Sequence, residues 1–162
     1  MQITTVEQLE QVRAHCKKMV TKRAMTAGAA SAVPYAVAGI AADVGLLLEL
    51  LPKINSAFGL DPEQIDALDE QAKQQILVLA GGASSHLIGK VVTKELVLAA
   101  LKAVGVRTTI KAAASWVPFI GSAVGGVMGF GMMKFVGNQH VDECYDLIKK
   151  MLEKPTAQAV AA

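Results

Sequence analysis

Apolar residues recur at helical spacing along most of the chain, and this pattern begins close to the N-terminus. Thr4 and Thr5 open two overlapping capping boxes, because an acidic or amide side chain follows each of them three residues later. From Val6 onward, apolar positions repeat every three or four residues up to Val20. The pattern predicts an amphipathic helix over residues 6–23.

Three further helices are predicted from the same periodicity, over residues 61–79, 94–104 and 141–152. Asp61 is a favourable N-cap because Pro62 follows it at the first helical position. Thr93 is expected to cap the next helix in the same way.

Two long stretches without any charged residue separate these helices, Ala24–Ala42 and Ala112–Met133. The second contains 22 residues, about 33 Å of helix, which matches the hydrocarbon core of a bilayer. Pro34 and Pro118 are expected to kink or start helices inside the two stretches. Gly137-Asn138 is expected to end the second.

No segment alternates apolar and polar residues as a sheet would require. The sequence therefore predicts an all-α fold, a compact multi-helix bundle with the two Ala/Gly-rich apolar helices at its centre. We expect one helical domain over residues 1–154 and a frayed tail over 155–162.

The composition indicates what those central helices do. The chain has 162 residues, of which 52% are hydrophobic but only 4% aromatic, and 14 are glycine. Glycine inside a helix costs up to about 1 kcal/mol relative to alanine, a cost that close approach of a neighbouring helix offsets. Two strips of small residues have the spacing for such contact: Gly121, Gly125 and Gly129, and Gly81, Ser85 and Gly89. The spacing fits a membrane hairpin and the core of a soluble bundle equally well.

The net charge of +2 is too small for a dedicated nucleic-acid binder. The charge is unevenly distributed, because residues 1–23 carry a net +3 and residues 43–73 a net −5. Four basic side chains close the first helix: Lys17, Lys18, Lys22 and Arg23. They are a candidate surface for anionic lipid or an acidic partner, or a solvated face that favours a helix C-terminus.

The candidates for chemistry are few. Cys16 and Cys144 form no CxxC pair, so we expect reduced, half-buried thiols. His140 and Cys144 lie four residues apart on one helix face, a spacing that zinc ligands use. We interpret them as helix-surface residues and predict no metal, no cofactor and no catalytic residue.

Two stretches of sequence are similar to a known family. VPYAVAGIAADVGLLLELLPKINSAFGLD resembles the segment of EcsC-like bacterial proteins in which a proline precedes an aspartate and a leucine-rich helix. VPFIGSAVGGVMGFGMMKFVGN resembles their later glycine-rich helix, and similar helical domains are attached to some GTPases. The resemblance implies an all-helical module that associates with membranes or partners and has no established catalytic residues. The chain lacks the GxxxxGK[ST] loop of the GTPases, so nucleotide hydrolysis is not expected.

The sequence thus favours a non-enzymatic helical module that binds a membrane surface or a partner protein, or itself as a homo-oligomer, through its Ala/Gly-rich helices. The alternative is a fully soluble interaction or inhibitor protein in which those helices form the core. The polar N-terminus carries no secretory signal, so we expect a cytoplasmic protein or one peripheral to the inner face of a membrane.

Overall fold

The computed structural model describes residues 3–31, 36–81, 87–103 and 122–153. Its helices are α1 (Val6–Ser31), α2 (Ala36–Phe58), α3 (Pro62–Asp66), α4 (Glu70–Gly81), α5 (Lys94–Ala103) and α7 (Ser122–Glu153). These ranges contain no strand, which confirms the predicted all-α fold.

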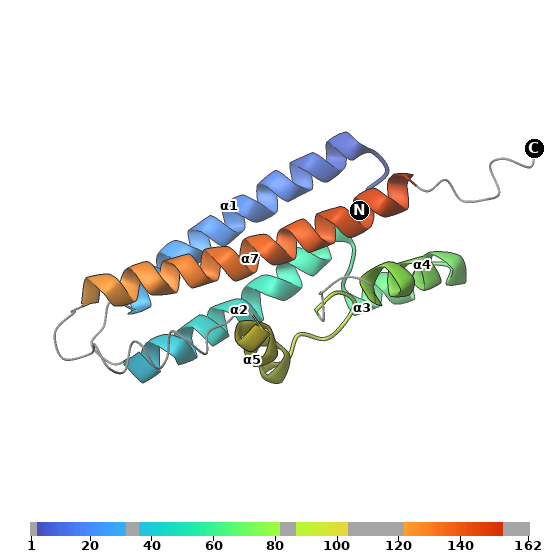
Figure 1. The fold of residues 1–162 in the computed structure, drawn as a ribbon. Helices are drawn as coiled ribbons and strands as arrows, with labels where there is room; N and C mark the ends of the chain where they lie inside the picture. Colours follow the sequence, from blue (N-terminus) through green and yellow to red (C-terminus); the bar gives the residue numbers. More distant parts are fainter. Residues whose placement is uncertain (1–2, 32–35, 82–86, 104–121, 154–162) are drawn as a thin grey trace, which may run out of the picture.

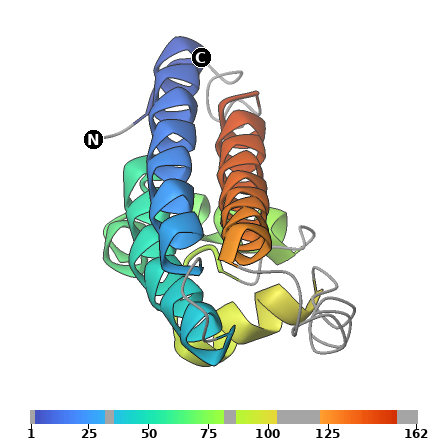
Figure 2. The ribbon, with the colours of Figure 1, turned by 90° about the vertical axis from the view of Figure 1, so that its left-hand side faces the viewer.

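Three long helices form the centre of the bundle. α1 and α7 lie side by side and run in opposite directions, and α2 packs against both of them (Figure 1). α5 crosses below the long helices, as the rotated view makes clear (Figure 2). The fully buried large side chains come mostly from the three central helices and are Phe58, Leu9, Leu47, Leu50, Leu51, Ile54, Leu60, Met133, His140, Val20, Val97 and Val141.

Three of the predicted helix starts, those of α1, α3 and α5, are confirmed by their capping bonds, whereas the start expected at residue 141 is wrong because α7 begins at Ser122. The Asp61 carboxylate accepts a hydrogen bond from the Gln64 backbone N–H at 2.9 Å, and the Gln64 side chain completes the capping box. Thr93 Oγ1 accepts from the backbone N–H of Leu96 at 3.4 Å at the start of α5. At the start of α1, Thr5 Oγ1 accepts a hydrogen bond from the backbone N–H of Gln8 at 3.2 Å.

The predicted helix ends are less accurate. α1 continues eight residues beyond residue 23, because Ala24 and Ala27 are buried and extend its packed face. The helix expected over residues 61–79 is divided into α3 and α4. The second start is set by Asp69, whose carboxylate accepts a hydrogen bond from the Ala72 backbone N–H at 2.8 Å.

The expected break at Gly137-Asn138 is wrong, because α7 runs through it without interruption. Gly137 is buried where α7 meets α1, and a Cβ atom there would lie 2.8 Å from Val20 Cγ1. The glycine is therefore used for close approach of two helices and not as a helix stop.

The strip Gly81, Ser85 and Gly89 does not form a helix face. α4 ends at Gly81, Ser85 lies outside the described residues, and Gly89 occupies a turn with φ of +68°. Left-handed backbone of this kind is the reason for a glycine at position 89. Of the other strip, Gly125 and Gly129 lie within α7, and Gly121 lies outside the described residues.

Candidate functional site

A cluster of buried polar side chains joins α2, α7 and the turn before α5. Asn55 is only 1% exposed, and its Nδ2 donates to the Leu87 carbonyl at 3.0 Å. This bond makes Oδ1 the acceptor, which lies 2.8 Å from His140 Nε2 and 3.7 Å from Cys144 Sγ. His140 Nε2 therefore carries the proton in this network.

The cluster corrects the expectation that His140 and Cys144 are helix-surface residues. His140 is 2% exposed, and both Cys144 and Cys16 are fully buried. His140 Nδ1 makes no hydrogen bond in the described structure, although the Glu143 carboxylate lies 3.8 Å from it. His140 and Cys144 do share one face of α7, as predicted, and this face is turned toward the core.

Burial also defines what the two thiols can do. It raises the pKa of the Cys16 thiol to about 11. The pKa of Cys144 is raised well above its ordinary value, first by burial and then by the Glu143 carboxylate and Cys16. A nucleophilic cysteine needs the opposite, a lowered pKa and access for a substrate. The cluster thus has the properties of a structural polar core.

The four basic residues of α1 have different surroundings. Lys17 Nζ lies 2.9 Å from Asp142 Oδ1 of α7, and the same carboxylate accepts from Arg13 Nη2 at 2.8 Å. Arg23 pairs with Glu49 of α2, which also pairs with a lysine one turn further along α2. Two of the four predicted surface-binding residues therefore serve the packing of α1 on its neighbours.

Lys18 and Lys22 are the exposed members of the predicted patch. Neither makes an ion pair with any residue in the described ranges. Met25 is also on this side of α1 and is 65% exposed. The exposed surface of α1 is thus less basic than the sequence predicts, and it includes an apolar side chain.

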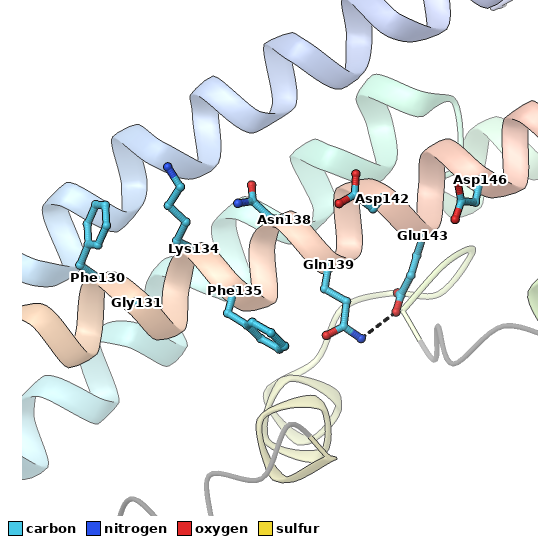
Figure 3. Close-up of a pocket in the computed structure, with 9 residues that line it drawn as sticks. All are labelled: Phe130, Gly131, Lys134, Phe135, Asn138, Gln139, Asp142, Glu143 and Asp146. Atoms are coloured by element: carbon cyan, nitrogen blue, oxygen red, sulfur yellow. Dashed lines mark hydrogen bonds between the residues drawn. The ribbon is translucent and has the colours of Figure 1, made fainter.

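A shallow pocket of about 790 Å³ extends along the outer side of α7 (Figure 3). We call it the α7 pocket; its lining residues are Phe130, Gly131, Lys134, Phe135, Asn138, Gln139, Asp142, Glu143 and Asp146. Phe130 and Lys134 point toward α1, whereas Phe135 and Gln139 point away from it (Figure 3).

The two ends of the α7 pocket differ in character. Phe135, 55% exposed, gives the N-terminal end an apolar surface, whereas Lys134 Nζ is turned toward α1, where it donates a hydrogen bond to Thr21 Oγ1 at 3.1 Å. The C-terminal end carries the carboxylates of Asp142 and Asp146. Such a surface suits an amphipathic helix with apolar and basic residues.

Sequence reasoning did not identify Asn55 or Phe135 as site residues. Asn55 follows Leu51 by four residues and Leu47 by eight, so it is a polar residue on an apolar helix face, which is a readable signal. Phe135 lies beside the end of the second uncharged stretch, and only its exposure in the folded chain distinguishes it.

Within the described ranges, no group of three or more His, Cys, Asp or Glu side chains is arranged to hold a metal ion. None of the helices described combines the length and the apolar content that crossing a bilayer requires. Comparison with family models, with curated proteins and with solved structures finds no match to the chain. The resemblance to EcsC-like proteins stays a prediction.

Proposed function

We propose that the chain is a non-catalytic helical module that binds a partner protein through the outer side of α7. The observation that carries this proposal is Phe135, a large apolar side chain that is 55% exposed and lines the N-terminal end of the α7 pocket. Aromatic residues are enriched at the centres of protein interfaces because they bury much area at little entropic cost.

A partner protein is favoured over a membrane surface because the unpaired basic residues of α1 would attract an anionic membrane only weakly. Each basic residue near an anionic membrane contributes about 1 kcal/mol. Lys17 and Arg23 are already paired, so Lys18 and Lys22 remain, and together they contribute about 2 kcal/mol. Stable attachment to a membrane needs a second anchor beyond an attraction of this size.

The proposal is tested by site-specific photocrosslinking in cells that make the protein. We place p-benzoylphenylalanine at position 135 or, as a control, at Val91, an apolar residue that is 71% exposed on another part of the surface. A discrete adduct with another protein is expected from position 135 only. Equal adducts from both positions, or none from position 135, would refute the proposal.

The membrane alternative has its own test, sedimentation with phosphatidylglycerol vesicles. We expect the protein to stay in the supernatant at physiological salt. Strong pelleting that is lost in the variant Lys18→Glu/Lys22→Glu would favour membrane binding instead.

A further inference from the structure

The N-terminal end of the α7 pocket has the form of a hole into which a side chain of another helix packs. When two helices pack, a side chain of one enters a hole made by four residues of the other, at positions i, i+3, i+4 and i+7. Four lining residues of the pocket have this spacing, namely Gly131, Lys134, Phe135 and Asn138. We call this set the Gly131 hole.

The floor of the Gly131 hole is open. Gly131 is exposed, and a Cβ atom added to it would meet nothing within 4 Å. Phe135 and Lys134 point to opposite sides of α7 (Figure 3). Lys134 Nζ is held toward α1 by Thr21 Oγ1 at 3.1 Å and lies 5.8 Å from the centre of the Phe130 ring. A large apolar side chain can therefore enter over Gly131 and contact Phe135.

Gly131 also differs from Gly137 in what its small size achieves inside the chain. A glycine destabilises a helix relative to alanine, and close approach of a neighbour offsets that cost. For Gly137 the neighbour is Val20 of α1. Gly131 has no such neighbour within the described residues, yet the exposed Phe135 follows it by one turn. Both features suit the close approach of a helix from outside the chain.

The acidic end of the α7 pocket has one carboxylate that is free to attract a cation. Asp142 is already held by Arg13 and Lys17 of α1. Glu143 accepts a hydrogen bond from a side chain of α7 itself. Asp146 is exposed and forms no ion pair with any residue in the described ranges. A basic residue of a partner would therefore meet Asp146 and not Asp142.

Phe135 and Asp146 lie on one line along α7. They are eleven residues apart, which is about 16.5 Å along a helix and only about 20° around it. A second helix that lies along α7 has the same rise per residue, so its contacts with the two side chains are also about eleven residues apart.

We propose that the α7 pocket binds an amphipathic helix of a partner protein. This helix packs a large apolar side chain over Gly131 against Phe135, and it places a lysine or arginine beside Asp146, about eleven residues away. The inference rests on the proposed function, because it names the kind of partner element that the same surface binds. A single helix face offers less area than a standard interface, so we expect transient binding.

The described helices of the chain itself do not provide such an element. In α1, the residue eleven positions before the exposed Met25 is Ala14. The residue eleven positions after the exposed Val6 is Lys17, which the Asp142 carboxylate already holds. α4 has 12 residues, too few to hold such a pair with either of its exposed apolar side chains. We therefore infer a different protein as the partner, and not a second copy.

Photocrosslinking in cells at two positions tests the helical form of the partner. We place p-benzoylphenylalanine at position 135 or, in a separate chain, at position 146, and map both adducts by mass spectrometry. The two sites on the partner should lie in one segment, about eleven residues apart. An extended segment would place them about five residues apart.

The other outcomes of this mapping each overturn the proposal. They are a spacing of about five residues, sites on separate segments, an adduct from position 135 only, and an adduct with a second copy of the chain. If position 135 gives no adduct at all, the proposed function fails as well.

Filling the Gly131 hole tests the packing directly. Gly131→Leu should lower the yield of the adduct at position 146, three turns away, at least about tenfold. The fold should persist, because nothing lies within 4 Å of the added Cβ, and thermal unfolding of the purified variant checks this. Gly45→Leu is the matched control, because Gly45 is an exposed glycine of α2 that also has nothing within 4 Å. Equal yields in the two variants overturn the helix contact. If position 135 still gives its adduct in the wild-type chain, the proposed function stands.

Reversing the charge at Asp146 tests the basic residue of the partner. Asp146→Lys should lower the yield of the adduct at position 135 about two- to fivefold, as expected for an exposed ion pair. Asp66→Lys is the control, because Asp66 is exposed on α3 and forms no ion pair within the described ranges. A yield in Asp146→Lys that matches this control overturns the proposed basic contact.

Discussion

Asn55 carries a large share of the specificity of the core. Its amide uses both ends, since Nδ2 donates to the Leu87 carbonyl and Oδ1 accepts from His140. The Asn55 carbonyl also accepts a backbone hydrogen bond from Leu60 at 2.8 Å, where the chain leaves α2. One side chain and its backbone thereby fix α2, α7 and the turn at residues 87–89 relative to one another.

Asn55→Leu is expected to lower the free energy of unfolding by about 2–4 kcal/mol. The substitution keeps the branched shape of the side chain but leaves the Leu87 carbonyl and His140 Nε2 buried without partners, at about 1–3 kcal/mol each. Urea unfolding followed by circular dichroism measures the loss. Ser56→Ala, at the exposed neighbouring position, should change stability by less than about 0.5 kcal/mol. Equal effects of the two substitutions would show that the amide network does not stabilise the fold.

The buried thiols predict how stability depends on alkaline pH. A raised pKa in the folded state means that the unfolded chain loses its thiol protons first. Stability is therefore fully present below about pH 9 and falls as pH rises toward the folded pKa, which for Cys16 is about 11. The expected slope is about 1.4 kcal/mol per pH unit for each cysteine.

In the variant Cys16→Ala, the free energy of unfolding should fall less steeply as pH rises, because the contribution of one buried thiol is removed. Unfolding free energies from pH 7 to pH 10.5 measure the slope, and the lysines and tyrosines contribute equally in both proteins. A variant whose alkaline slope matches that of the wild-type chain would contradict the buried, protonated Cys16.

At the scale of the helices, Gly137 sets the distance between α1 and α7. Gly137→Ala gains up to about 1 kcal/mol of helix propensity, but its Cβ would lie 2.8 Å from the stiff Val20 side chain. Overpacking of this kind costs about 1–3 kcal/mol, so we expect a net destabilisation of about 1 kcal/mol in thermal or urea unfolding.

Gly131 provides the matched control within the same helix. An added Cβ there meets nothing within 4 Å, so Gly131→Ala should stabilise the protein by up to about 1 kcal/mol. Adding Val20→Ala to Gly137→Ala should recover stability beyond the sum of the single effects, since it removes the clash. If both glycine variants gain stability alike, Gly137 is not a packing glycine.

The helices show which features of the fold could be predicted from the sequence. The caps at Asp61 and Thr93 were predictable because a cap depends on residues within one turn. The role of Gly137 was not, because Gly-Asn is locally a stop signal that is overridden by the packing of Val20, 117 residues earlier. The split at Asp69 was missed because the apolar period continues across it.

The candidate site was less predictable than the fold for the same reason. His140 and Cys144 were recognised as sharing a face, but their inward direction depends on Asn55, 85 residues away in sequence. The sequence predicts the four basic residues of α1 as one surface, although Lys17 and Arg23 pair with residues on two other helices. Exposure of Lys18 and Phe135 is a property of the assembled bundle.

At the scale of the whole molecule, Asp142 connects the basic N-terminal segment to the C-terminal helix. Burial alone would raise the pKa of its carboxyl group, but the hydrogen bonds from Lys17 and Arg13 outweigh burial and lower it. A lowered folded pKa contributes stability above the unfolded value, near 3.8, and the contribution is lost as pH falls through the folded pKa.

Asp142→Asn is therefore expected to destabilise the protein by about 0.5–1 kcal/mol at pH 7, a modest value because the carboxylate is partly exposed and solvent-screened. The difference from the wild-type chain should shrink below about pH 4, where the wild-type carboxylate takes up its proton. Asp66→Asn is the control, because Asp66 is exposed and forms no ion pair within the described ranges. Urea unfolding at pH 3 to pH 7 separates the two variants. A constant difference for Asp142→Asn across this range would mean that it stabilises the α1–α7 contact by packing and not by charge.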